Sequence, residues 1–141
     1  YCFAKRHHLR FLLWFGMLRE SFTQRAPGAA RCKERRPTGN HLYKPIGMRA
    51  ILEGKRHISW LVMMDMDAWF HPDHFETNHW GKFLSTKADI VAGAPSYSVL
   101  VNAALLAFKN SSITHELLPL WVANRCGIKD QLPLWNSIFV L

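Results

Sequence analysis

Apolar residues recur along the chain with two spacings, one typical of helices and one of short buried strands. Residues 44–57 place most of their apolar side chains on one helical face, and Pro45 suits a first turn, so we expect a helix there. The next residues, 58–64 (ISWLVMM), form a continuous apolar run of strand length that ends abruptly at Asp65. Such a run is typical of a parallel strand that is buried on both faces.

Three more segments are expected to contribute strands or other apolar elements. After a short helical or irregular start, residues 9–15 predict a hydrophobic strand flanked by charged residues. Residues 88–94 predict a strand that is closed by Pro95. Residues 99–108 form a further apolar element.

Two helices are expected in the last part of the chain. Ser111 or Ser112 can cap a helix over the apolar residues that follow, and Pro119 would bend this helix. A final helix is expected to start at Asp130, because Pro133 would then fall in its first turn. Helices that alternate with buried strands predict a layered α/β fold.

The length of 141 residues suits one domain with its own core. No apolar run reaches the roughly 18 residues that are needed to cross a bilayer. Residues 9–18 superficially resemble a signal peptide, but they lack a small-residue cleavage site and are bracketed by Arg10 and Arg19, so the strand interpretation is favoured. Because the chain begins at Tyr1 without a Met, we expect it to be a piece of a longer protein.

Positive charge is concentrated in the first part of the chain. Residues 1–57 hold 13 Lys and Arg against three Glu, a net charge of +10, whereas the remaining residues hold five Lys and Arg against seven acidic residues, a net charge of −2. Residues 19–40 carry Pro and Gly among Arg and Lys and predict a basic loop. This bias fits nucleic acid, an acidic membrane surface or a phosphate-bearing ligand, although a solvated Arg-rich loop is the favoured interpretation for residues 25–36.

The three cysteines, Cys2, Cys32 and Cys126, are widely spaced and show no zinc-binding pattern. A disulfide between Cys32 and Cys126 is possible in an oxidising compartment.

Two carboxylates, Asp65 and Asp67, follow directly after a predicted buried strand in the sequence WLVMMDMDAWF. In open α/β sheets, ligands bind outside the carboxyl ends of the strands. Two Asp residues separated by one residue in a loop can direct oxygens at one hard cation, and Mn²⁺ or Mg²⁺ there would neutralise a diphosphate leaving group. The alternative is that both Asp residues cap a helix or lie in an ordinary turn.

The blocks around this motif resemble glycosyltransferase family 34, which contains fungal galactosyl- and mannosyltransferases and plant xyloglucan xylosyltransferases. The order Tyr43-x-Pro45, helix, Trp60, hydrophobic strand and D-x-D-A is similar to the family pattern Y/W-x-K or K-P, helix, W-hydrophobic-D-S-D-A. VNAALLAFKNS looks like the family's L/V-N-x-G-x-F-L-I-R-N-S, and DQLPLWNSI looks like its D-Q-x-A-L. The order and spacing of the blocks agree over residues 44–138.

The resemblance implies that residues 1–141 are a partial catalytic domain with the GT-A fold, an incomplete Rossmann-like mixed sheet with flanking helices. It implies retaining transfer of a hexosyl or pentosyl unit from a nucleotide-diphospho-sugar to a glycan or glycoprotein acceptor, with Mn²⁺ or Mg²⁺. The expected location is the Golgi lumen, behind a membrane anchor outside this chain, and nucleic acid is not an expected partner. The implied donor-binding residues are Lys44, Asp65, Asp67, Asn102 and Ala104, the implied metal ligands are Asp65 and Asp67, and the implied catalytic residues are Asp130 and Gln131.

The chain also departs from the family pattern. Ala104 stands where the family has Gly, Lys109 replaces Arg, and Met66 replaces Ser. Because a Cβ at Ala104 can crowd a ligand, weakened sugar binding or a catalytically inactive transferase-like protein are alternatives. The family's first strand, which holds the nucleotide, and its C-terminal metal-binding His have no counterpart in this chain, so we expect the 141-residue chain by itself to be inactive.

Two other functions fit parts of the sequence. In phosphatases of the haloacid dehalogenase type a strand also ends in D-x-D, but that class has Thr or Val where this chain has Trp69. A basic module that binds nucleic acid or an anionic surface would explain the charge of residues 1–57, but the basic residues are not interleaved with aromatic ones.

Histidine and tryptophan side chains supply further candidates. His71 and His74 follow the D-x-D motif and could contact a metal, although a loop His is more often solvated. Four Trp residues could stack on sugar rings, but two of them have helical spacing and are expected in the core. The four are Trp69, Trp80, Trp121 and Trp135, and the two with helical spacing are Trp121 and Trp135.

Overall fold

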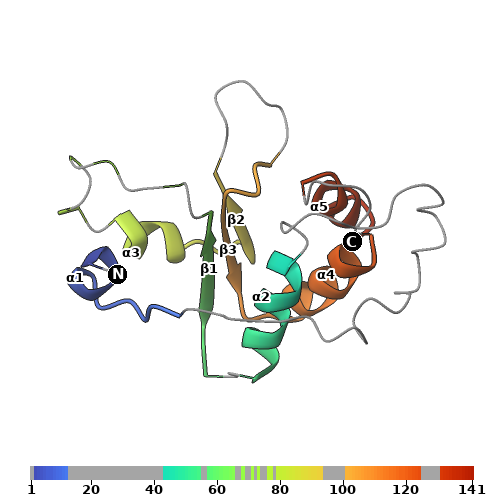
Figure 1. Cartoon of the computed structure of the whole chain (residues 1–141), viewed down its shortest axis with the longest axis horizontal. Coiled ribbons are helices and arrows are strands. Elements are labelled where there is room, and N and C mark those ends of the chain that lie inside the picture. Colours follow the sequence, from blue (N-terminus) through green and yellow to red (C-terminus); the bar gives the residue numbers. More distant parts are fainter. Residues whose placement is uncertain are drawn as a thin grey trace.

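Helices lie on both sides of a short sheet in the described part of the chain (Figure 1). The computed structural model describes residues 2–12, 43–54, 57–65, 68, 71, 73, 76–77, 79–93, 101–124 and 131–141. The predicted basic loop over residues 19–40 lies outside these ranges. Within them, the predicted α/β class is confirmed.

The sheet consists of β1 (Trp60–Met64), β2 (Ile90–Ala92) and β3 (Leu105–Lys109), in the order β1-β3-β2. Both pairings with β3 are antiparallel, and Met64 lies opposite Leu105. The expected Rossmann-like strand order is therefore wrong for these three strands. The expectation that the apolar run is a parallel strand buried on both faces is also wrong, since β1 pairs antiparallel and its last residue, Met64, is 39% exposed. Continuous apolar character alone does not determine which segment becomes the neighbouring strand.

Helices α2 (Tyr43–Gly54), α4 (Ser112–Ala123) and α5 (Gln131–Ile138) lie on one side of the sheet and enclose the main core with it (Figure 1). The helix predicted over residues 44–57 is confirmed as α2, although α2 ends at Gly54 and His57 is not helical, and Pro45 lies in its first turn. The buried members of this core are Met48, Leu52, Leu61, Ala103, Leu106, Phe108, Leu117, Leu118, Trp121 and Leu134.

Helices α1 (Cys2–Arg6) and α3 (His79–Leu84) lie on the other side of the sheet (Figure 1). They meet through Phe3 and Trp80, whose ring centroids are 6.4 Å apart in an edge-on arrangement. The chain leaves α1 through His8, which has a positive φ of 54°, and the amide of Leu9 donates to the carbonyl of Ala4. Residues 9–12 form no strand, so the strand predicted over residues 9–15 is wrong for its described part.

The ends of α4 and α5 follow local rules. The Oγ of Ser111 accepts a hydrogen bond from the amide of Thr114 at 3.4 Å, which confirms the predicted N-cap. Pro119 lies inside α4, and the bend expected there stays a prediction. Helix α5 begins at Gln131, so Pro133 falls in its first turn as expected.

Candidate functional site

Lys44 and Asp65 form an ion pair at the end of β1. Lys44 is the second residue of α2, and Asp65 directly follows the last residue of β1. Their Nζ and Oδ1 atoms are 2.5 Å apart, and the side chains are only 18% and 23% exposed, respectively. Oδ1 of Asp65 is itself buried and accepts no hydrogen bond of good geometry from the described residues. The positive charge of the nearby Lys44 ammonium therefore offsets the cost of burying this negative oxygen.

The turn that leads into β3 lies directly beside Asp65. The amide of Asp65 donates to the carbonyl of Ala104 at 2.8 Å, which extends the β1–β3 pairing by one residue. The amide of Ala104 in turn donates to Oδ1 of Asn102 at 2.7 Å, a local bond of the kind that Asn makes in turns. Asn102 and Ala104 are therefore held next to the carboxyl end of β1.

Gln131, the first residue of α5, reaches the same turn. Its Nε2 donates to the carbonyl oxygen of Val101 at 3.1 Å, and Nε1 of Trp135 donates to the same oxygen at 2.6 Å. One carbonyl thus anchors the start of α5 beside Asn102. Five predicted site residues therefore gather at one end of the sheet, namely Lys44, Asp65, Asn102, Ala104 and Gln131.

The other two predicted site residues, Asp67 and Asp130, lie outside the described residues. Asp67 comes two residues after Asp65, and Asp130 directly precedes Gln131. Their roles as metal ligand and catalytic residue stay predictions.

The Asp65 end of the sheet fits a cation in its chemistry. A buried carboxylate oxygen without a hydrogen-bond donor is a suitable ligand for a hard divalent ion, and the Lys44 ammonium already lies at that oxygen. No three His, Cys, Asp or Glu side chains come together within the part of the chain that the structure describes. A metal here would therefore need oxygen ligands from elsewhere, such as Asp67 or the phosphates of a bound donor.

The other metal and sugar candidates are less well placed. Nδ1 of His71 lies 3.4 Å from Oδ2 of Asp73, and both side chains are exposed. Trp80 and Trp121 are buried and so cannot stack on a sugar ring, which confirms the core position expected for Trp121. Trp135 is half-buried and lies on the Val101 turn, so it is the described Trp nearest to the predicted site. Of the remaining candidates, Cys2 is exposed and free, whereas His74, Trp69, Cys32 and Cys126 lie outside the described residues.

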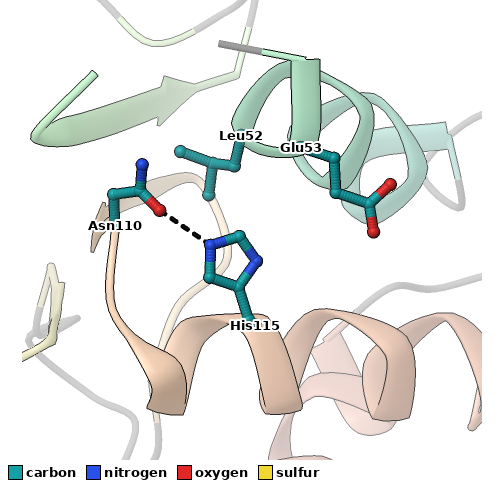
Figure 2. Close-up of a pocket in the computed structure, with 4 residues that line it drawn as sticks. All are labelled: Leu52, Glu53, Asn110 and His115. Carbon is teal, nitrogen blue, oxygen red and sulfur yellow. Dashed lines mark hydrogen bonds between the residues drawn. The ribbon is translucent and has the colours of Figure 1, made fainter. Parts of the chain in front are cut away.

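A cavity of about 470 Å³ lies at the opposite end of β3 (Figure 2). It is lined by Leu52, Glu53, Asn110 and His115, none of which the sequence singled out as a site residue. Nδ2 of Asn110 donates to the carbonyl of Ile58 at 2.9 Å, so its Oδ1 is the acceptor for Nε2 of His115 at 2.7 Å. These bonds tie the end of β3 to β1 and α4.

The cavity and the Asp65 end of the sheet are thus separate places in the fold. The bonds of Asn110 serve to hold strands and helix together, and the His115 side chain is exposed. The Asp65 end instead combines two poorly exposed opposite charges with side chains from four separate segments. We therefore regard the Asp65 end as the candidate functional site, because burying charges is costly and needs a reason.

Comparisons of the chain with protein-family models, with curated proteins and with solved structures find no significant match. In the described part of the chain, no helix has the length and apolar character to cross a membrane.

Proposed function

We propose that this protein is the catalytic core, or part of it, of a retaining glycosyltransferase that uses a nucleotide-diphospho-sugar and a divalent metal ion. The observation that carries the proposal is the gathering of Lys44, Asp65 and Asn102, together with Gln131, at one end of the sheet. These residues are distant in sequence and belong to three blocks that resemble the same enzyme family. Their convergence is what a shared donor site requires.

Each of these residues has its own proposed role in donor binding, which follows from its chemistry. Asp65 and Asp67 would hold Mn²⁺ or Mg²⁺, which when bound supplies positive charge for the diphosphate leaving group. Lys44 adds a second positive charge beside the diphosphate, since its ammonium group lies at Asp65. Asn102 uses its Oδ1 in the turn, so its Nδ2 donors can serve a phosphate or sugar oxygen.

The start of α5 would face the reacting sugar. Gln131 is tied to the Val101 carbonyl, which fixes the beginning of the helix beside the Asn102 turn. A carboxylate at the preceding position, Asp130, can stabilise the positive charge that develops at the anomeric carbon as its bond to phosphate breaks. The amide of Gln131 can orient the sugar or the attacking hydroxyl group.

We propose that the three described strands and their helices belong to a GT-A core. The acceptor is a glycan or glycoprotein, and the site of action is the Golgi lumen, with a membrane anchor outside this chain.

Chelation of divalent metal is the direct test of this function. We expect the full-length protein to consume a nucleotide sugar in the presence of Mn²⁺, to lose this activity with excess chelator, and to regain it when Mn²⁺ is restored. The measurement is nucleoside diphosphate release over a panel of uridine- and guanosine-diphosphate sugars. Hydrolysis of phosphate monoesters, or binding of nucleic acid without any turnover of nucleotide sugar, would contradict the proposal.

Asp130→Asn tests the proposed role of this carboxylate. Asn caps helices about as well as Asp, so the fold and the melting temperature should be kept. Loss of the negative charge should slow transfer by at least about tenfold if the carboxylate stabilises the transition state. The check is the initial rate of sugar transfer beside a thermal melt, and full activity with an unchanged melt would leave Asp130 only the capping role.

A further inference from the structure

The Lys44–Asp65 ion pair affects how tightly a cation can bind at Asp65. An ammonium group lies 2.5 Å from Oδ1, the carboxylate oxygen that is a candidate ligand for a divalent cation. Because both side chains are less than a quarter exposed, solvent and salt screen this pair less than a surface pair. A metal ion must therefore compete with a charge that the protein itself provides.

We propose that Lys44 is a built-in counter-ion of Asp65, which competes with divalent cations for this carboxylate and so lowers the cation affinity of the site. The inference rests on the proposed function only in taking the cation to be the metal of the donor site. The same pair also protects the fold without metal, because Oδ1 of Asp65 would otherwise be a buried charged atom with no partner among the described residues.

Two features of the structure distinguish the Lys44–Asp65 pair from an ordinary surface ion pair and favour its competition with a bound cation. Lys44 lies in the first turn of a helix whose next residues, Pro45 and Ile46, are buried, so its backbone position is held by the core. Asp65 is held by its own amide, which donates to Ala104. The backbone positions of both residues are thus set by contacts other than the ion pair itself.

The test is Mn²⁺ binding without nucleotide, measured by the electron paramagnetic resonance signal of free Mn²⁺ at fixed pH and ionic strength. Lys44→Met removes the charge and keeps an unbranched apolar stem of similar length. We expect this variant to bind Mn²⁺ at least about tenfold more tightly than the wild type, because the carboxylate loses its only competing cation in the described structure. Lys44→Arg keeps the positive charge and should stay within about threefold of the wild type.

Two controls show whether the effect comes from Asp65. Lys87→Met removes an exposed positive charge at the opposite end of the sheet, near the start of β2, and should leave Mn²⁺ affinity within about twofold. In Lys44→Met/Asp65→Asn, the gain in affinity should disappear. Thermal melts provide a second readout, since added Mn²⁺ should raise the melting temperature of Lys44→Met more than that of the wild type.

Lys44→Gln serves as a second neutral variant if Lys44→Met does not fold, because its amide can still donate to the carboxylate. The inference is overturned if the folded neutral variant binds Mn²⁺ no more tightly than the wild type. It is also overturned if no variant binds Mn²⁺. Tighter Mn²⁺ binding by the neutral variants, together with no sugar transfer by the wild-type protein, keeps the inference and removes the proposed function. Mn²⁺-dependent transfer by the wild-type protein, together with unchanged Mn²⁺ affinity in the neutral variants, does the reverse.

Discussion

Replacing Asp67 with alanine is expected to reduce Mn²⁺-dependent sugar transfer by at least about 100-fold, the scale on which a single electrostatic group acts in a transition state. Asp67 is the second carboxylate of the D-x-D motif, and in the proposed function it is a direct ligand of the metal. Its partner in the motif, Asp65, lies beside Lys44 and the Asn102 turn, and Asp67 follows Asp65 by two residues in the sequence. Without its carboxylate, the charge of the diphosphate leaving group would be poorly compensated.

Initial rates over a series of Mn²⁺ concentrations measure this effect. Asp73→Ala is the matched control, since Asp73 is an exposed carboxylate a few residues further along whose described partner is His71. It should keep its activity within about twofold, as expected of an exposed charge outside the site. Normal Mn²⁺-dependent transfer by Asp67→Ala would remove the metal site from the proposed function.

Trp121→Ala is expected to lower the free energy of unfolding by about 3–5 kcal/mol, the usual cost of truncating a large buried aromatic residue. Trp121 is fully buried in α4 and stacks on Phe108 of β3, with ring centroids 6.4 Å apart. Helix α4 also packs against α2 and α5, so the lost side chain lies where three helices meet the sheet. Since a domain of this kind is stable by only about 5–15 kcal/mol, the variant would be close to unfolding.

Urea unfolding, followed by circular dichroism, measures the change. Leu132→Ala provides the control, because Leu132 is apolar but 59% exposed on α5, and its truncation should cost at most about 0.5 kcal/mol. Trp121→Phe should fall between the two, since it keeps a ring against Phe108. A loss below about 1 kcal/mol in Trp121→Ala would mean that the core is not organised around this side chain.

Local sequence signals were sufficient for the elements that depend on neighbouring residues. Ser111 caps α4 and Pro45 lies in the first turn of α2 as the sequence predicts, because caps and first turns are decided within about four residues. The end of β1 at Asp65 also follows from the sequence, since a charged residue ends an apolar run. In contrast, residues 9–12 continue into an apolar run but form no strand, because strand formation depends on pairing with another segment, which the pattern alone cannot show.

By itself, then, the sequence determined the class of the fold, the main helices and the candidate residues of the site. It could not determine that β1 pairs antiparallel with β3, because the pairing depends on a segment about 40 residues away along the chain. Nor could it show that Lys44 lies against Asp65, or that Gln131 is anchored to Val101. Such contacts exist only after α2, α5 and the sheet have packed around Trp121, because packing alone brings charges and amides from distant segments within bonding distance.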